Sequence, residues 1–273
     1  MRVLLFSIFF LIKRKTNSAV LLAFMVLMIP PAWAEEEPRI YDRSKAKAYT
    51  VGVYDDDMMP LWGFNEEGEY DGFARSLLEE FAQNQNIRFI YKPYSAKKIV
   101  PALKQGDVQL IFPANKHWHR KQKSSSDRII YSDGVHFYLE GIMVAREYTF
   151  KPLSSLDAIG IIAGKQPASI QDSADRGAVA VVEKPSYADL FEALASGEIQ
   201  GIYTNVDVAR ARAKALGYKA GFIEFQESTS HLRERYRLAT IKEEGVMREF
   251  NEFIFENEKY LKALQRDFDI TGR

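Results

Sequence analysis

The sequence of 273 residues contains no cysteine and no excess of either charge. The absence of cysteine excludes a disulfide framework, a thiolate zinc site, a cysteine nucleophile and a lipid anchor on cysteine. The 37 basic residues are matched by 37 acidic ones, so the clustered basic surface that a nucleic acid needs is not expected. The sequence also lacks the H-E-x-x-H, P-loop and G-x-S-x-G motifs of common enzyme classes. We therefore expect no nucleic-acid partner and no cofactor.

Residues 1–34 have the pattern of a secretory signal. They contain four basic residues and no acidic one, then the apolar run 19–29, two prolines and an A-x-A end at Ala32 to Ala34. Cleavage after Ala34, with no cysteine for a lipid, predicts a protein of the periplasm of a double-membrane bacterium. The alternative is an uncleaved membrane anchor, but this apolar run of 11 residues is shorter than the roughly 20 that a spanning helix needs.

The 239 residues that follow carry a net charge of −4, because residues 1–34 hold four of the 37 basic residues and none of the 37 acidic ones. Their length fits one large domain or two modest ones and is sufficient to bury a core. Residues 35–47 are polar and are expected to form a flexible leader.

Short apolar runs then alternate with amphipathic stretches along the chain. The predicted strands are 49–54, 87–92, 108–112, 158–164, 178–183 and 199–203. The predicted helices are 73–84, 95–107, 186–198 and 206–217, followed by a long C-terminal amphipathic pattern at 245–268. This alternation is typical of a parallel α/β sheet.

Two segments in different halves of the chain have the same order of elements. IVPALKQGDVQLIF (99–112) and LFEALASGEIQGIY (190–203) each predict a helix, a glycine turn, an acidic residue and a strand. Two similar α/β lobes explain this repetition. Ligands of open α/β sheets bind beyond the carboxyl ends of the strands, which is where residues 113–120 and 202–207 are expected to lie.

Four motifs, in this order and spacing, resemble the bacterial extracytoplasmic solute-binding proteins of family 3, the polar-amino-acid type. The motifs are YTVGVYDDDMMPLWGFNEEGEYDGFARSLLEEF, IVPALKQGDVQLIF, RIIYSDGVHFYLEGIMVARE and SYADLFEALASGEIQGIYTN. The resemblance covers residues 48–270. It implies a two-lobe α/β periplasmic-binding-protein-like fold of type II, with mostly parallel sheets and flanking helices.

In that family the chain crosses a hinge between the lobes twice, and the C-terminal helix returns to the first lobe. The resemblance implies crossings near residues 144–146 and 233–238. Lobe 1 would then comprise residues 48–144 and 239–273, and lobe 2 residues 145–238.

The resemblance also implies ligand-binding positions in lobe 1. The arginine that grips a ligand carboxylate corresponds to Arg120, although the segment from Arg120 to Tyr131 is several residues longer here than in the family. A hydroxyl-bearing position of the family corresponds to Asn115. Pro113 stands where a backbone N–H often binds the carboxylate, and proline has no N–H to donate.

Three further family positions carry neutral polar side chains in this sequence. The acidic residue after the first strand corresponds to Tyr54, the hydroxyl after IIAG to Gln166, and the aspartate that binds an α-ammonium to Asn205. A buried ammonium without a carboxylate partner is costly to desolvate. A carboxylate-bearing solute, or a polar solute stacked on aromatic rings, is therefore expected in preference to a plain α-amino acid.

Aromatic residues near these positions can provide flat faces for a solute. Trp62, Tyr94 and Trp118 are the candidates, with core packing as the alternative for each. His117 and His119 flank Trp118, and two histidines in an H-x-H pattern can bind zinc. However, a zinc site needs three or four ligands, and solvated loop histidines are the preferred interpretation.

The function that follows is capture of a small polar solute by a monomeric protein, which an inner-membrane ABC permease then recognises. Two alternatives remain open. The first is a catalytic member of the same fold, similar to cyclohexadienyl dehydratase, using Asp55, Asp56, Asp57 or Glu140 as acid or base. The second is a ligand-sensing module that reports to a membrane receptor.

Overall fold

The computed structural model describes residues 45–118 and 128–270. The strands are β1 (Lys47–Tyr54), β2 (Gly63–Phe64), β3 (Tyr70–Asp71), β4 (Ile87–Tyr94), β5 (Leu110–Ala114), β6 (Ile130–Tyr131), β7 (His136–Ala145), β8 (Ala158–Ile162), β9 (Ala180–Lys184), β10 (Gly201–Asn205), β11 (Ile223–Phe225) and β12 (Leu232–Thr240). The helices are α1 (Phe73–Asn84), α2 (Ile99–Gln105), α3 (Gln171–Asp175), α4 (Tyr187–Ser196), α5 (Val206–Ala215), α6 (Glu244–Glu256) and α7 (Glu258–Asp267), with short 3-10 helices η2 (Arg146–Tyr148) and η3 (Leu153–Ser155).

One mixed sheet runs through the described residues in the order β4-β1-β5-β12-β7-β10-β8-β9, with β6 beside β12 and β11 beside β7. Strands β4, β1 and β5 are parallel, and so are β10, β8 and β9. Strands β12 and β7 lie between these groups and pair antiparallel with β5, with each other and with β10. Parallel neighbours need crossover connections, and helices supply them in each group.

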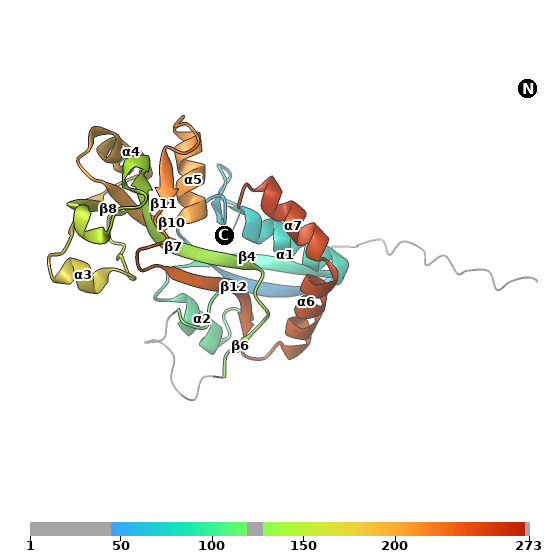
Figure 1. Ribbon diagram of the computed structural model, residues 1–273. Helices are drawn as coiled ribbons and strands as arrows, with labels where there is room; N and C mark the ends of the chain where they lie inside the picture. The colour runs from blue at the N-terminus through green and yellow to red at the C-terminus, as the bar shows by residue number, and fades with distance from the viewer. Residues whose placement is uncertain (1–44, 119–127, 271–273) are drawn as a thin grey trace, which may run out of the picture. The chain divides into compact units, whose positions relative to one another are not determined.

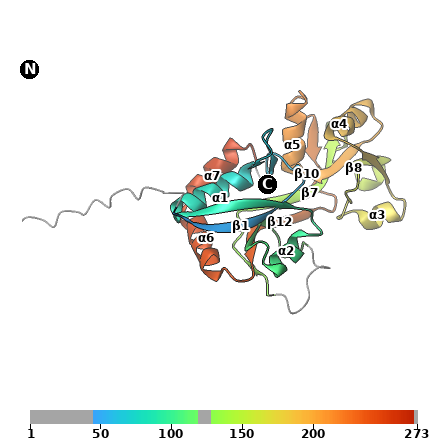
Figure 2. The same cartoon turned by 180° about the vertical axis from the view of Figure 1, so that it is seen from behind.

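We call β4, β1, β5 and β6 with α1, α2, α6 and α7 the first half, and β8, β9, β10 and β11 with α3, α4 and α5 the second half. Helices cover both faces of the sheet in each half (Figure 1, Figure 2). Helices α1 and α7 lie on one face of the first half and α2 on the other, while α4 and α5 lie opposite α3 in the second half.

The long strands β7 and β12 carry the chain between the halves. Residues 136–140 of β7 pair with residues 232–236 of β12, and residues 140–144 of β7 pair with β10. Strand β12 then pairs with β5 through residues 237–240. The lobe boundaries at residues 144 and 238 stay a prediction.

The C-terminal segment packs on the first half through aromatic rings. Phe81 of α1 lies 5.0 Å from Phe250 and 5.5 Å from Phe253 of α6, measured between ring centroids. All three side chains are buried, and burial of each stabilises the fold by roughly 1.5–3 kcal/mol. The long amphipathic pattern at 245–268 forms two helices, α6 and α7, which meet at Asn257.

Two element predictions differ from the structure. Helix α2 begins at Ile99 and not at Ser95, because Ser95 to Lys98 form a turn closed by a bond from Lys98 N to Ser95 O of 2.9 Å. Gly106 ends that helix in the left-handed conformation with φ 82°, as the sequence predicted. Strands β7 and β12 were not predicted as strands, although the alternation of charged and apolar residues along β12 is a strand pattern; both pair with strands remote in sequence.

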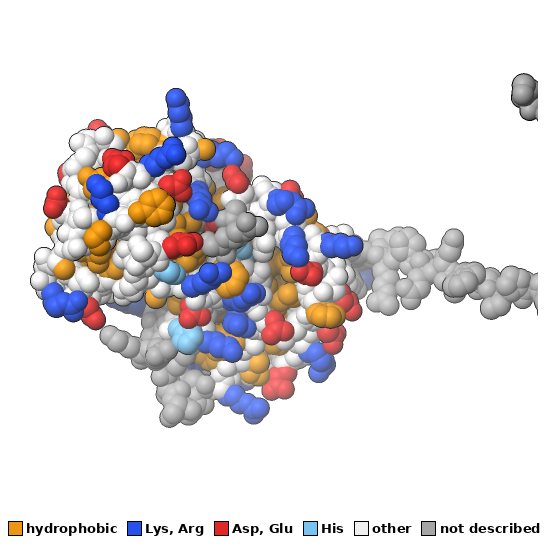
Figure 3. Space-filling view, viewed as in Figure 1, with side chains coloured by type: hydrophobic (Ala, Val, Ile, Leu, Met, Phe, Trp, Pro, Cys, Tyr) orange, Lys and Arg blue, Asp and Glu red, His pale blue; other side chains and the backbone are white. Residues whose placement is uncertain are grey.

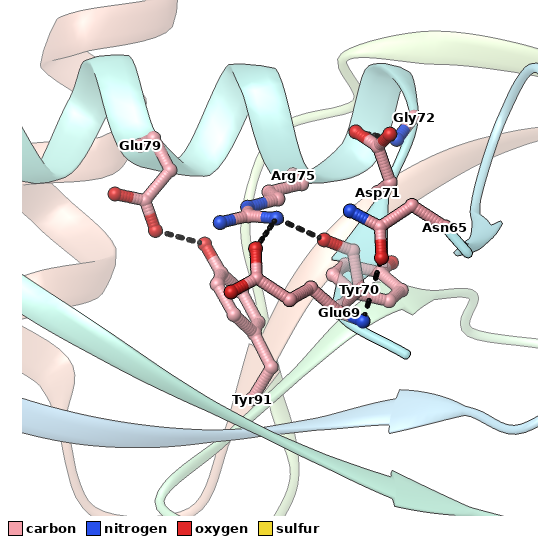
Figure 4. A network of polar contacts seen from close by, with 8 residues as sticks. All are labelled: Asn65, Glu69, Tyr70, Asp71, Gly72, Arg75, Glu79 and Tyr91. Atoms are coloured by element: carbon pink, nitrogen blue, oxygen red, sulfur yellow. Dashed lines mark hydrogen bonds and ion pairs between the residues drawn. The ribbon is translucent and has the colours of Figure 1, made fainter. Parts of the chain in front are cut away.

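A polar network fixes the segment between β2 and α1 (Figure 4). Arg75 Nη1 donates to Glu69 Oε2 at 3.1 Å and to Tyr70 O at 2.8 Å. Gly72, with φ 100°, allows this segment to approach residues 60–61, because a Cβ there would lie 3.0 Å from the carbonyl oxygens of Pro60 and Leu61. The network and this close approach thereby fix the position of the segment next to Trp62.

Basic and acidic side chains are interspersed on the face of the molecule in Figure 3. Among the described residues, none of the helices has the length and apolar character needed to span a bilayer.

Candidate functional site

A cavity of about 740 Å³ lies at the carboxyl ends of parallel strands from both halves, the position where open α/β sheets bind ligands. Its walls come from the segments after β1, β4 and β5 in the first half, from β7, and from the segments after β8, β9 and β10 with α5. The lining residues are Tyr54, Asp56, Asp57, Met58, Trp62, Ala96, Trp118, Tyr138, Glu140, Ile162, Lys165, Gln166, Pro185, Ser186, Tyr187, Ala188, Tyr203, Thr204, Asn205, Arg212, Ala215 and Leu216.

Aromatic rings form one wall of the cavity. The Tyr54 ring lies 6.1 Å from Trp62 and 5.9 Å from Trp118, and Trp118 meets the Tyr138 ring edge-on at 5.1 Å. Edge-to-face contacts of this kind stabilise the rings in place. Tyr236 lies behind Trp62 and Trp118 and is almost fully buried. The wall is therefore rigid and apolar, with tyrosine hydroxyls at its margin.

Glu140 provides a carboxylate on this wall. Glu140 and Tyr138 project from the same face of β7, and the Tyr138 hydroxyl donates to Glu140 Oε2. The Tyr203 hydroxyl of β10 also acts on the Glu140 carboxyl group and accepts a hydrogen bond from Ser169 N at 3.0 Å. Burial raises the pKa of Glu140, and the hydrogen bonds from Tyr138 and Tyr203 oppose that rise.

Asn205 stands directly opposite Glu140 in the antiparallel pairing of β10 with β7. Its Oδ1 caps α5 by accepting from Asp207 N at 3.0 Å and Val208 N at 3.2 Å. Its Nδ2 is buried and has no hydrogen-bond partner among the described residues. Asn205 thus lines the cavity with a side-chain donor that helix capping leaves unpartnered.

Two ion pairs join the halves across the cavity. Lys165 Nζ lies 2.8 Å from Asp56 Oδ2, and Asp56 Oδ1 accepts from Trp62 Nε1 at 2.9 Å. Arg212 Nη2 of α5 lies 2.5 Å from Asp57 Oδ1, without hydrogen-bond geometry. The aspartates belong to the segment after β1 and the cations to the second half, so each pair favours approach of the halves.

The structure brings together five of the eight side chains predicted to bind ligand. The cavity is lined by Tyr54, Trp62, Trp118, Gln166 and Asn205. Their role in binding stays a prediction.

The other three predicted residues are placed differently. Tyr94 pairs with Tyr54 across β4 and β1 and is not among the lining residues. Asn115 is also outside the lining, and its amide serves the backbone, accepting from His117 N at 2.7 Å and donating to Arg235 O at 3.1 Å. Arg120 lies outside the described residues.

His119, the second histidine of the H-x-H pattern, also lies outside the described residues. Within the described ranges, no cluster of three His, Cys, Asp or Glu side chains is suited to hold a metal ion.

Charged residues of the cavity were missed as ligand-binding candidates. Asp56, Asp57, Glu140, Lys165 and Arg212 all line it. The expectation that an ammonium would find no acidic partner is revised, because three carboxylates reach the cavity. The available signals were the run of three aspartates after a strand and the glutamate two residues after Tyr138. Their convergence depends on residues far apart in the sequence.

Comparison with known structures identifies the fold. A substrate-binding domain of GlnP from Lactococcus lactis, solved in its open conformation, has a TM-score of 0.60 and 15% identity, and the match covers 82% of this chain and 95% of that one. An ancestral arginine-binding protein bound to arginine has a TM-score of 0.57 and 20% identity, over 81% and 97% of the two chains. The chain has the fold of the two-lobe periplasmic binding proteins.

This result confirms the predicted fold class and the resemblance at the level of fold. A third similar structure is an ancestral amino-acid-binding protein described as a precursor of cyclohexadienyl dehydratase, with a TM-score of 0.57, 20% identity and coverage of 81% and 94%. No family model and no curated protein matches this chain.

Proposed function

We propose that the protein captures a small polar, carboxylate-bearing solute in the periplasm and presents it to an inner-membrane ABC permease. Residues 1–34 act as the cleavable signal, and the protein works as a monomer. The observation that carries this proposal is the cavity of about 740 Å³, whose lining comes from both halves of a two-lobe fold. A solute in such a site contacts both lobes at once and so stabilises their approach.

The two lobes have different tasks in this mechanism. The aromatic wall of Tyr54, Trp62 and Trp118 receives the solute on the first lobe, and Arg120, two residues after Trp118, grips its carboxylate. Gln166 and Asn205 complete the contacts from the second lobe. The Nδ2 of Asn205 supports this arrangement, since it is a donor with no partner among the described residues and belongs to a residue that lines the cavity.

Mass spectrometry of solutes that co-purify with the protein tests this function, followed by calorimetry with the solute identified. Arg120→Ala is expected to weaken binding by about 2 to 5 kcal/mol, because a carboxylate loses its charged partner. Arg128→Ala is the matched control, since Arg128 is an exposed arginine outside the lining. Equal affinities of both variants and the wild type would remove Arg120 from the site.

Catalysis is the second candidate function, and one observation favours it. A carboxyl group whose pKa is raised, as that of Glu140 is, can act as a general acid in a cavity. Turnover of prephenate-like cyclic acids by the purified protein, lost in Glu140→Gln, would establish an enzyme. Binding without turnover supports the transport function, and co-purification with a membrane receptor instead of a permease would indicate sensing.

A further inference from the structure

The charges that line the cavity do not cancel within the described residues. The carboxylates are those of Asp56, Asp57 and Glu140, and the cations are Lys165 and Arg212. Each cation is already paired with one aspartate, at 2.8 Å and 2.5 Å. Glu140 is thus the lining carboxylate that has no cationic side chain within ion-pair distance in the described part of the chain.

Glu140 is held in a defined position by its neighbours. The Tyr138 hydroxyl donates a hydrogen bond to it, the Tyr203 hydroxyl also acts on it, and Trp118 lies 5.1 Å from the Tyr138 ring. Hydrogen-bonded tyrosines keep the carboxylate from turning away, while their rings present π faces and edges to the cavity. A carboxylate beside several aromatic rings is the chemistry that recognises a cationic group, by ion pairing and by cation–π contact together.

We infer that Glu140 selects the solute by charge, and that the solute carries a cationic side chain, with an ammonium or guanidinium group that binds the Glu140 carboxylate beside Trp118, Tyr138 and Tyr203. This inference rests on the proposed solute-binding function and narrows its substrate class to cationic, amino-acid-like solutes. The acceptor that faces Asn205 Nδ2, opposite Glu140 in the strand pairing, belongs to the same solute.

The cavity should prefer a cation because moving a charge from water into a site lined by aromatic rings costs free energy. A cation that enters loses hydration, and a fixed carboxylate offsets that loss. A dianionic solute would lose hydration and also meet the like charge of Glu140. The same cavity should therefore rank solutes of equal shape by their charge.

Binding of a cation should also depend on pH. Burial raises the pKa of Glu140, and a cation binds the charged form of this group. Affinity for a cation is then lost as pH falls through that raised pKa. The other titratable groups that act on Glu140 are Tyr138, Tyr203, Tyr187 and Tyr236, whose pKa values burial raises further above 10, and Lys165.

Calorimetry with matched probes tests the inference. L-Arginine and L-citrulline have nearly the same shape and differ in the charge of the side chain, and L-glutamate provides an anionic probe. The wild type is expected to bind L-arginine at least about 30-fold more tightly than L-citrulline. Equal or tighter binding of L-citrulline or L-glutamate overturns the inference but leaves the solute-binding function intact. Binding of no probe and no co-purified solute overturns both.

Two variants test whether Glu140 is responsible for the preference for a cationic solute. Glu140→Gln keeps the shape and can still accept from a tyrosine hydroxyl, and it should reduce the ratio of arginine to citrulline affinity to near one while citrulline still binds. Glu192→Gln, an exposed residue of α4 outside the cavity, is the matched control and should keep the wild-type ratio. A ratio unchanged by Glu140→Gln contradicts the inference. If that variant does not fold, the wild type decides: an arginine preference that falls with decreasing pH supports the role of Glu140, and a preference independent of pH overturns it.

Discussion

At the scale of single residues, Asn205 combines a structural role with an available binding group. Its Oδ1 caps α5, and its Nδ2 is buried and unpartnered among the described residues. An aspartate would cap the helix equally well, but it would place a second carboxylate opposite Glu140. The amide therefore satisfies the helix without adding negative charge to the cavity.

Substitution at this residue should separate the two roles. Asn205→Ser keeps a capping oxygen and removes the amide donor, so the free energy of unfolding should change little while solute affinity falls. Asn205→Ala removes both groups and should also cost about 1 kcal/mol of stability. Urea unfolding and calorimetry on both variants measure the difference. Full solute affinity in Asn205→Ser would show that Nδ2 does not contact the solute.

At the scale of elements, α5 and β7 are joined by a buried polar contact. His136 Nε2 of β7 lies 3.0 Å from Asp207 Oδ2 of α5, and both side chains are only 2% exposed. The Val208 side chain, next in α5, packs with the core of the first half. The start of α5, which also carries Asn205, is therefore anchored at the junction of the two halves.

Removing the carboxylate at this junction should be strongly destabilising. Asp207→Ala leaves His136 buried without that partner and is expected to lower the free energy of unfolding by about 3 kcal/mol. Asp157→Ala, at an exposed position, is the control and should stay within about 0.5 kcal/mol of the wild type. Chemical denaturation provides the measurement. A loss below about 1 kcal/mol would mean that the contact contributes little.

At the scale of the whole molecule, two ion pairs join the halves across the cavity. The pairs of Lys165 with Asp56 and of Arg212 with Asp57 are partly exposed, with Asp57 64% and Lys165 56% accessible. Ion pairs of this exposure stabilise a protein by roughly 0–1 kcal/mol and are screened by salt. They can shift a balance between open and closed forms without determining the fold.

Breaking one pair should therefore open the solute-free protein more than it destabilises it. Asp57→Asn is expected to increase the radius of gyration in small-angle X-ray scattering, with little change in melting temperature. About 1 M salt, where the Debye length is about 3 Å, should have the same effect on the wild type. Glu258→Gln breaks an exposed pair with Lys262 on α7 and serves as the control. Identical scattering of Asp57→Asn and wild type would exclude a role for this pair in closure.

The sequence by itself determined the order along the chain of the parallel strands and of α1, α2, α4 and α5, because their apolar periodicity is a local property. Helix α3 was not predicted. Helix α1 has the predicted bounds 73–84, and Gly106 ends α2 as expected. The aromatic wall and Asn205 could also be predicted as parts of the site, since they lie at or after the ends of strands. Strands β7 and β12 were missed because their stability comes from pairing with strands remote in sequence, and the break at Asn257 has no strong local signal.

Only the tertiary structure decided the electrostatic character of the cavity. Glu140, Asp57 and Arg212 lie far apart in the chain, and their charges matter through distances that folding alone sets. Folding also pairs both cations of the cavity with aspartates and places Glu140 beside tyrosines. Neither arrangement can be read from the order of residues in the sequence. Local patterns encode which elements form, whereas the balance of charge in a site arises from the meeting of separate elements.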